Sequence, residues 1–288
     1  MGSLATHFST FLFLVPIGVR RLYSSFSLFL NDPSLYRSKP WFFFDPSWKN
    51  LDLYALLVAL PIASLTELFL FLSFSGHPSY RFSFLQHGTV IFIFWALLIL
   101  IVLREFSEPS ALNESFLFVL GGVAFLLEYF ICKNGFTGVS SIVYDWLSDL
   151  TLVCALCCLY LSVKPSSFLA DFLFSIGLIF KGTWMLQAGL NLYTHTFGLK
   201  GCHKLSLLPR QEQVDVKCDL DEDSLRGISL VNLLFVGHAI VVLLVCLGLF
   251  GLLSHNRALR CDERSGPLLA GSEPHNVTMQ PLNEIEMD

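Results

Sequence analysis

The chain has 288 residues, of which 54% are apolar and only 14% are charged, and its formal net charge is −5. Its mean hydropathy is +0.63, whereas soluble domains carry about a quarter charged residues. The modest charge and the lack of a basic cluster exclude nucleic acid as an expected partner. The composition predicts a multi-pass membrane protein whose main partner is the lipid bilayer.

Seven apolar blocks are candidates for membrane spans, each of which needs about 20 apolar residues. They cover residues 4–19, 51–74, 82–103, 113–132, 141–162, 168–193 and 227–253. The first block is short, but no basic segment precedes it, and Arg20 and Arg21 follow it. We therefore interpret it as a retained helix and not as a cleaved signal. The sequence predicts an all-α membrane protein, a seven-transmembrane helix bundle formed by residues 1–253.

The placement of lysine and arginine predicts the orientation of this bundle. These residues are more frequent after the first, third and fifth spans and in the tail than in the opposite loops. Because they favour the cytosolic side, we expect a lumenal or extracellular N-terminus and a cytosolic C-terminus. The loop before the last span then faces an oxidising compartment, in which Cys202 and Cys218 can form a disulfide.

Two further segments lie outside the predicted spans. Residues 20–50 are aromatic and punctuated by proline, with Trp41, Phe42–Phe44 and Trp48 near their end. Aromatic side chains are enriched at membrane interfaces, so we expect this connection at the headgroup level. Residues 254–288 are polar and rich in Pro, Gly and Asn, which predicts a disordered cytosolic tail.

The stretch Phe180–Asn191 places a lysine, an indole and two amides inside the sixth apolar block. Polar residues of the other spans lie at related depths when each span is numbered from its predicted lumenal end. Such groups are costly in lipid and normally face a bundle interior or a wet cavity. We therefore predict one polar ligand-binding cavity that opens to the non-cytosolic side. Its candidate residues are Glu67, Gln86, His87, Glu128, Asp149, Lys181, Thr183, Trp184, Gln187 and His238.

Structural interpretations of these residues remain open beside ligand binding. Lys181 can pair with Asp149, its expected partner, and the other polar groups can form hydrogen bonds between helices. Glu67, His87 and His238 are candidate metal ligands, although no HxxxH or HxxH spacing marks a ligand helix. No cofactor can be assigned. Three glycines should let the sixth helix approach its neighbours closely, and these are Gly177, Gly182 and Gly189.

Several motifs spread over the chain carry a family resemblance. They are His7 with Gly18, Glu67 in SLTELF, Gln86-His87-Gly88-Thr89, Glu128 in LLEYF, Gly182-Thr183-Trp184 with Gln187 and Gly189, His238, and Leu268–Glu273. In this order and spacing the chain resembles a plant member of the transmembrane protein 45 family. The resemblance implies a multi-pass protein of the endomembrane system or the plasma membrane, linked in some plants to pathogen or virus response.

The chain departs from this family in two places. Lys181 stands where family members tend to have glutamine, and the region FICKNGFTGVSSIVYDWL lacks the histidines that many of them carry. We expect a non-enzymatic role in binding, trafficking or stress response. One alternative is a metal-dependent enzyme acting on a lipid-like substrate through Glu67, His87, Glu128 and His238. A second is a proton-coupled carrier, although the sequence shows no clear internal repeat.

Overall fold

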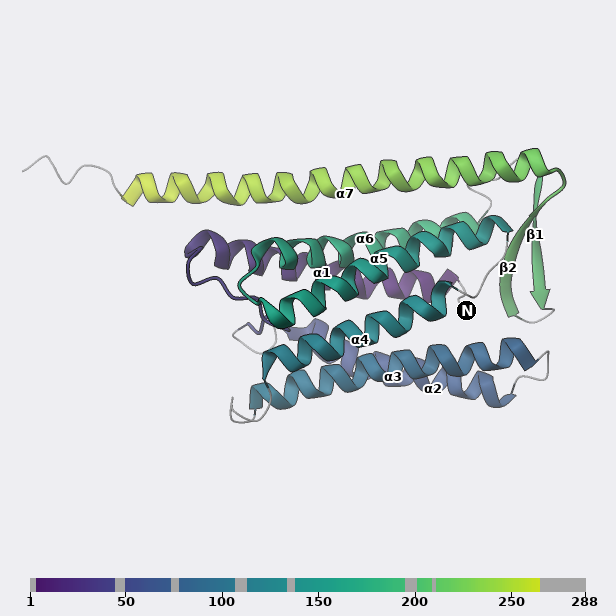
Figure 1. The fold of residues 1–288 in the computed structure, drawn as a ribbon, viewed down its shortest axis with the longest axis horizontal. Helices are drawn as coiled ribbons and strands as arrows, with labels where there is room; N and C mark the ends of the chain where they lie inside the picture. The colour runs from purple at the N-terminus through teal and green to yellow at the C-terminus, as the bar shows by residue number, and fades with distance from the viewer. Residues whose placement is uncertain are drawn as a thin grey trace, which may run out of the picture.

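The computed structural model describes residues 4–44, 50–73, 78–106, 113–133, 138–194, 201–208 and 211–264. In this part of the chain, seven helices are long and apolar enough to cross a membrane. They are α1 (Leu4–Asn31), α2 (Leu51–Ser73), α3 (Pro78–Phe106), α4 (Glu114–Lys133), α5 (Gly138–Val163), α6 (Phe168–Tyr193) and α7 (Asp221–Arg264). Strands β1 (Cys202–Leu208) and β2 (Gln211–Cys218) form an antiparallel hairpin between α6 and α7 (Figure 1).

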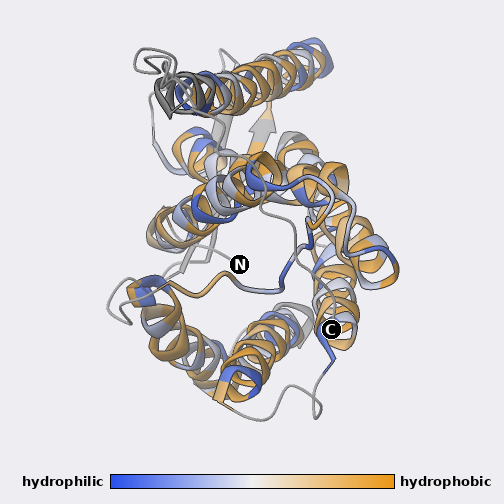
Figure 2. Cartoon of the chain, turned by 90° about the vertical axis from the view of Figure 1, so that its left-hand side faces the viewer, coloured by the Kyte–Doolittle hydropathy of each residue, from blue (hydrophilic) through white to orange (hydrophobic). Residues whose placement is uncertain are grey.

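The helices other than α7 form a ring in the order α1, α6, α5, α4, α3, α2, in which neighbours pack side by side (Figure 2). The ring is least closed between α2 and α1, which make few contacts with each other. Helix α7 lies outside the ring, mainly against α5 and α6 (Figure 1). Helices satisfy their backbone hydrogen bonds internally, so their apolar outer faces suit contact with lipid. The predicted membrane-type helical architecture is therefore confirmed.

Helices α1 and α6 approach each other closely because glycines stand at their contact. A Cβ atom on Gly182 would lie 2.9 Å from Val15 Cγ2, and one on Gly18 would lie 2.6 Å from Ile179 Cγ1. The expectation of close approach at three α6 glycines is confirmed, with Gly182 and Gly189 facing α1 and Gly177 facing α5. This contact fixes the position of α6, which carries most of the polar residues of interest.

The connection after α1 is shorter than the predicted segment of residues 20–50. Residues 20–31 continue α1, and Tyr36, Ser38 and Phe42 are buried. The Ser38 N–H donates to the carbonyl of Pro165, 2.8 Å away, in the turn between α5 and α6. The connection therefore packs against one end of the bundle. Trp48 lies outside the described residues.

The hairpin is an element that the sequence analysis does not predict. Cys202 and Cys218 are register partners at its base and form a disulfide. Beyond it, α7 continues to Arg264, so residues 254–264 are helical where disorder was expected, and the rest of the predicted tail lies outside the described residues. The hairpin lies at the same end of the bundle as the start of α1, and α7 ends at the opposite end (Figure 1).

Candidate functional site

The ring of helices surrounds a cavity of about 370 Å³, lined by α1, α2, α3, α4, α6 and the connection after α1. Its wall is mainly apolar, with Phe13 and Ile17 of α1, Leu60 of α2, and Phe94 and Leu98 of α3. Volumes of about 300–1,000 Å³ are typical of small-molecule sites. Polar side chains line this cavity at two levels along α1, which are described in turn.

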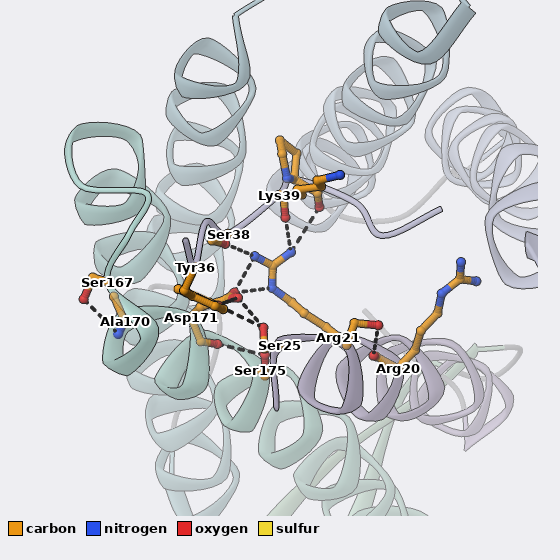
Figure 3. A network of polar contacts seen from close by, with 12 residues as sticks. Arg20, Arg21, Ser25, Tyr36, Ser38, Lys39, Ser167, Ala170, Asp171 and Ser175 are labelled. Atoms are coloured by element: carbon orange, nitrogen blue, oxygen red, sulfur yellow. Dashed lines mark hydrogen bonds and ion pairs between the residues drawn. The ribbon is translucent and has the colours of Figure 1, made fainter. Parts of the chain in front are cut away.

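At one end, the Arg21 side chain forms a buried ion pair with Asp171 of α6 (Figure 3). Its Nε donates to Asp171 Oδ1 at 2.8 Å and its Nη2 to Ser38 Oγ at 2.9 Å. Its Nη1 donates to the carbonyls of Lys39 and Pro40, at 2.9 and 3.1 Å. Every N–H direction of this guanidinium is thus matched, as a buried arginine requires.

The carboxylate of Asp171 has partners on its other side as well (Figure 3). Its Oδ2 accepts hydrogen bonds from the hydroxyls of Ser25 and Tyr36. Burial, together with the negative charge of Asp171, raises the pKa of Tyr36 well above its ordinary value, so the phenol stays protonated and donates. This cluster joins α1, α6 and the connection between α1 and α2 at one end of the cavity.

Arg20 forms a second ion pair, with Asp52 at the start of α2. Its Nη2 also donates to the Phe42 carbonyl at 2.6 Å and to Asn50 Oδ1 at 2.5 Å. The guanidinium carbon lies 4.6 Å from the ring centre of Phe44, a cation–π distance. These contacts tie α1 to α2 at the same end of the cavity as Arg21.

Further along the cavity, level with Val15 of α1, Lys181 of α6 forms an ion pair with Glu128 of α4. Both side chains line the cavity, and Lys181 is 3% exposed. The Lys181 Nζ also lies 5.3 Å from the ring centre of Phe125. The predicted pairing of Lys181 with Asp149 is wrong, because Asp149 points to the outside of α5 and pairs with Lys133 at 3.5 Å.

Thr183, Trp184 and His238 form a separate contact between α5, α6 and α7. The indole Nε1 of Trp184 donates to the Val143 carbonyl at 3.1 Å, and the side chain is fully buried. His238 Nε2 lies 2.9 Å from Thr183 Oγ1, and its ring stacks on Phe180 with 5.3 Å between centroids. These residues hold α7 against the ring and do not line the cavity.

The remaining candidates also lie away from the cavity lining. Glu67 of α2 packs against α3, where a Cβ atom on Gly88 would lie 3.2 Å from its Cβ. His87 is half-buried and Gln86 is exposed. Gln187 Nε2 donates to Asn191 Oδ1, 3.4 Å away and one turn further along α6. Of the ten predicted cavity residues, the structure thus brings Glu128 and Lys181 to this cavity.

The candidate metal ligands do not converge. Within the described residues, no group of three His, Cys, Asp or Glu side chains is arranged to hold a metal ion. Glu67 lies between α2 and α3, whereas His238 contacts Thr183 on the other side of the ring. The cavity at the centre of the ring is therefore lined by ion pairs and apolar side chains.

The sequence analysis does not single out Asp171, Tyr36 or Ser25, which complete the Arg21 cluster. Asp171 lies in the first turn of α6, where an acidic residue is ordinary because it complements the helix dipole. One signal was present. An aspartate inside a predicted span is costly in lipid and implies a cationic partner.

The fold and the site define a membrane-type bundle of seven helices with an apolar cavity flanked by paired charges. Residues 114–251, which include α4, α5, α6, the hairpin and most of α7, match the model of a family described as "Family of unknown function (DUF716)". The matched region contains Glu128, Asp171 and Lys181. No curated protein matches the chain.

Proposed function

We propose that this protein binds a lipid-like amphiphile in the cavity between its helices, without catalysing a reaction. The observation that carries the proposal is a mainly apolar cavity of about 370 Å³ inside a bundle of membrane-spanning type. Protein interiors are normally close-packed, and a cavity of this size is typical of a ligand site. A ligand with an apolar body fits a wall made of Phe13, Leu60 and Leu98.

The weak contact between α1 and α2 supports access from the bilayer. Each of these helices packs tightly on another one, α1 on α6 and α2 on α3, but they make few contacts with each other. Ser9 of α1 and Ala63 of α2 both line the cavity. Ser9 lies eleven residues before Arg20, and Ala63 lies eleven residues after Asp52, the partner of Arg20. Because α1 and α2 are antiparallel, Ser9 and Ala63 lie at the same level. A lipid-like molecule can enter through this seam without crossing water.

The metal-dependent enzyme has less support than binding, because it requires Glu67, His87, Glu128 and His238 to act on one substrate. Against it, the contacts of Glu67, Glu128 and His238 lie in different parts of the bundle. The single polar cavity predicted from their depths has less support for the same reason. No specific observation supports the alternative of a proton-coupled carrier.

The family, the membrane and the orientation of the protein are part of the same proposal. We infer a member of the transmembrane protein 45 family, of plant origin, in the endomembrane system or the plasma membrane, with a role in trafficking or in stress and pathogen response. The match to a family of unknown function over residues 114–251 is consistent with this assignment. A lumenal N-terminus and a cytosolic C-terminus are supported by the charge distribution and by the Cys202–Cys218 disulfide.

Cavity-filling substitutions test the proposal. Ala59 and Ala63 line the cavity, whereas the adjacent Val58 and Ile62 are 62% and 59% exposed on the outside of α2. The full chain is purified in mild detergent, and native mass spectrometry records retained lipids. Wild type, Val58→Trp and Ile62→Trp should retain a lipid-like molecule that Ala59→Trp and Ala63→Trp lose. Equal retention in all variants, or none in wild type, would overturn the proposal.

A further inference from the structure

We propose that the ligand of this cavity is a neutral single-chain lipid whose headgroup carries a hydroxyl, and that this hydroxyl binds beside the Glu128–Lys181 pair. This inference rests on the proposed function, because it names the chemistry of a ligand in the same cavity. Three observations carry it, namely the balance of charges, the hydrogen-bonding groups of this pair, and the length of the cavity.

The first observation is that each charged side chain of the cavity wall has an opposite charge beside it. Arg20 pairs with Asp52, Arg21 with Asp171, and Lys181 with Glu128. No net charge remains in these three pairs to compensate an ionic headgroup. Moving an uncompensated charge into such an environment costs several kcal/mol. A neutral headgroup avoids this cost.

The second observation concerns hydrogen bonding near Lys181. Glu128 accepts from Lys181 through Oε2, and a carboxylate has further acceptor sites on its second oxygen. Lys181 carries three N–H donors on one ammonium group. A hydroxyl can donate to Glu128 and accept from Lys181 at the same time, whereas an ester or ether oxygen can only accept. The pair therefore favours a ligand hydroxyl.

Beyond this pair, further from Arg20, the cavity wall holds other hydroxyl groups. Ser9 Oγ and Thr10 Oγ1 both donate to the carbonyl of Thr6, at 3.0 and 2.8 Å. Their protons are used within α1, so towards the cavity these oxygens act as acceptors. This part of the wall thus presents hydroxyl oxygens as acceptors. A headgroup with one or more hydroxyl donors complements it.

The third observation is the length of the cavity. Its wall runs along α1 from Thr6 to Arg20, which at 1.5 Å per residue is about 20 Å. Ile17 lines the stretch between the two polar levels, Phe13 and Leu60 lie beyond the Glu128–Lys181 pair, and Trp41 lies at the Arg20 end. A long and narrow apolar space of about 370 Å³ fits one alkyl chain better than two chains.

Competition between probes of fixed charge tests this inference. The full chain in phosphatidylcholine nanodiscs is cross-linked to a photoactivatable, clickable monoacylglycerol, and three competitors with the same alkyl chain are compared. They are the alcohol, the sulfonate and the trimethylammonium compound. In wild type the alcohol should compete about tenfold to hundredfold better than either ion, the range expected for hydrogen bonds to charged groups.

Changing the pair should change the preference. Glu128→Gln leaves the Lys181 charge unbalanced and should shift the preference to the sulfonate, whereas Lys181→Gln should shift it to the trimethylammonium compound. The double variant Glu128→Gln/Lys181→Gln is neutral again and should prefer the alcohol, which keeps the test valid if a single variant does not fold. Saturable labelling with equal competition by all three compounds, or with better competition by an ion, in wild type would overturn the inference while leaving the proposed function intact. Absence of saturable labelling in a protein that retains a lipid in native mass spectrometry would also overturn the inference, whereas absence of both would contradict the proposed function.

Discussion

Asp171 is a buried carboxylate on which side chains of α1 and of the connection after α1 converge. It binds Arg21, Ser25 and Tyr36, and it is fully buried. The cost of burying both charges is offset only when the remaining donors and acceptors are also matched. The carbonyls of Lys39 and Pro40 complete the Arg21 contacts. The path of the connection after α1 is therefore tied to this ion pair.

We expect Asp171→Asn to destabilise the protein by about 3–5 kcal/mol, because it leaves the Arg21 charge buried without a counter-charge. The free energy of unfolding is measured in detergent micelles by titration with a denaturing detergent. Proteolysis within residues 32–44 should also become faster, since the connection loses its anchor.

Asp149→Asn is the matched control for this substitution. Asp149 also pairs with a basic residue, Lys133, but the two side chains are 47% and 44% exposed. Exposed pairs contribute about 0–1 kcal/mol, so this variant should unfold like wild type. Equal stability of the two variants would show that the Arg21–Asp171 pair does not hold the connection in place.

The sequence alone could locate these charges along each span but could not pair them. Arg21 and Asp171 are separated by 150 positions, and the direction in which each side chain points depends on how its helix is rotated. The pairing of Lys181 with Asp149 was wrong for the same reason. Both residues lie within the membrane-spanning helices, but Asp149 is on the outer side of α5.

Among the elements, α1 and α6 form a closely packed helix pair of the ring. Gly182 and Gly18 allow this contact because their missing side chains leave room for Val15 and Ile179. In membranes such close packing is a main source of helix association, since lipid provides no hydrophobic drive between helices. The contact also sets the depth of Lys181, which directly precedes Gly182 in α6.

We expect Gly182→Ala to cost about 1–3 kcal/mol of stability, the range for an overpacked core. Its Cβ atom would lie 3.0 Å from Leu14 Cβ and 3.2 Å from the Val15 backbone nitrogen, so α1 has to shift. The protein is heated in steps, and size-exclusion chromatography of the soluble fraction gives the midpoint temperature of thermal aggregation.

Gly237→Ala provides the control, because nothing lies within 4 Å of the added Cβ atom in α7. This variant should match wild type or gain slightly, since alanine favours the helix more than glycine does. A loss of stability as large as that of Gly182→Ala would mean that the α1–α6 contact is not responsible.

Helices were predictable wherever a block was continuously apolar, and less so where charges enter a helix. Arg20 and Arg21 suggested the end of the first span, yet α1 continues to Asn31 because both guanidiniums find carboxylates inside the bundle. The hairpin is short and polar, so it could not be predicted from an apolar block in the sequence. The disulfide between Cys202 and Cys218 closes its base.

At the scale of the whole molecule, the ring of helices explains why polar residues at one depth do not share one cavity. Glu128 and Lys181 face the inside of the ring, whereas Thr183 and His238 meet at its contact with α7. Glu67 packs against α3. Depth could be counted from the sequence, but the rotation of each helix about its axis could not.

The two ends of the bundle should face different compartments. The hairpin disulfide lies at the end where α1 begins, and α7 ends at the other (Figure 1). Because disulfides persist in oxidising compartments, we expect the hairpin on the lumenal or extracellular side. This expectation agrees with the lysine and arginine distribution and can be checked with thiol reagents in sealed membrane vesicles.

The test compares two proteins that both carry Cys132→Ser and Cys261→Ser, so that neither the partly exposed Cys132 nor Cys261 reacts. In the first, Cys202 and Cys218 should resist a membrane-impermeant maleimide until a reductant is added, because they are joined. In the second, Cys202→Ser leaves Cys218 as a thiol, which should react only after cytosol-side-out vesicles are opened with mild detergent. Labelling of Cys218 in intact vesicles of this kind would reverse the orientation. Labelling of the first protein without reductant would show that the pair is not joined in native membranes.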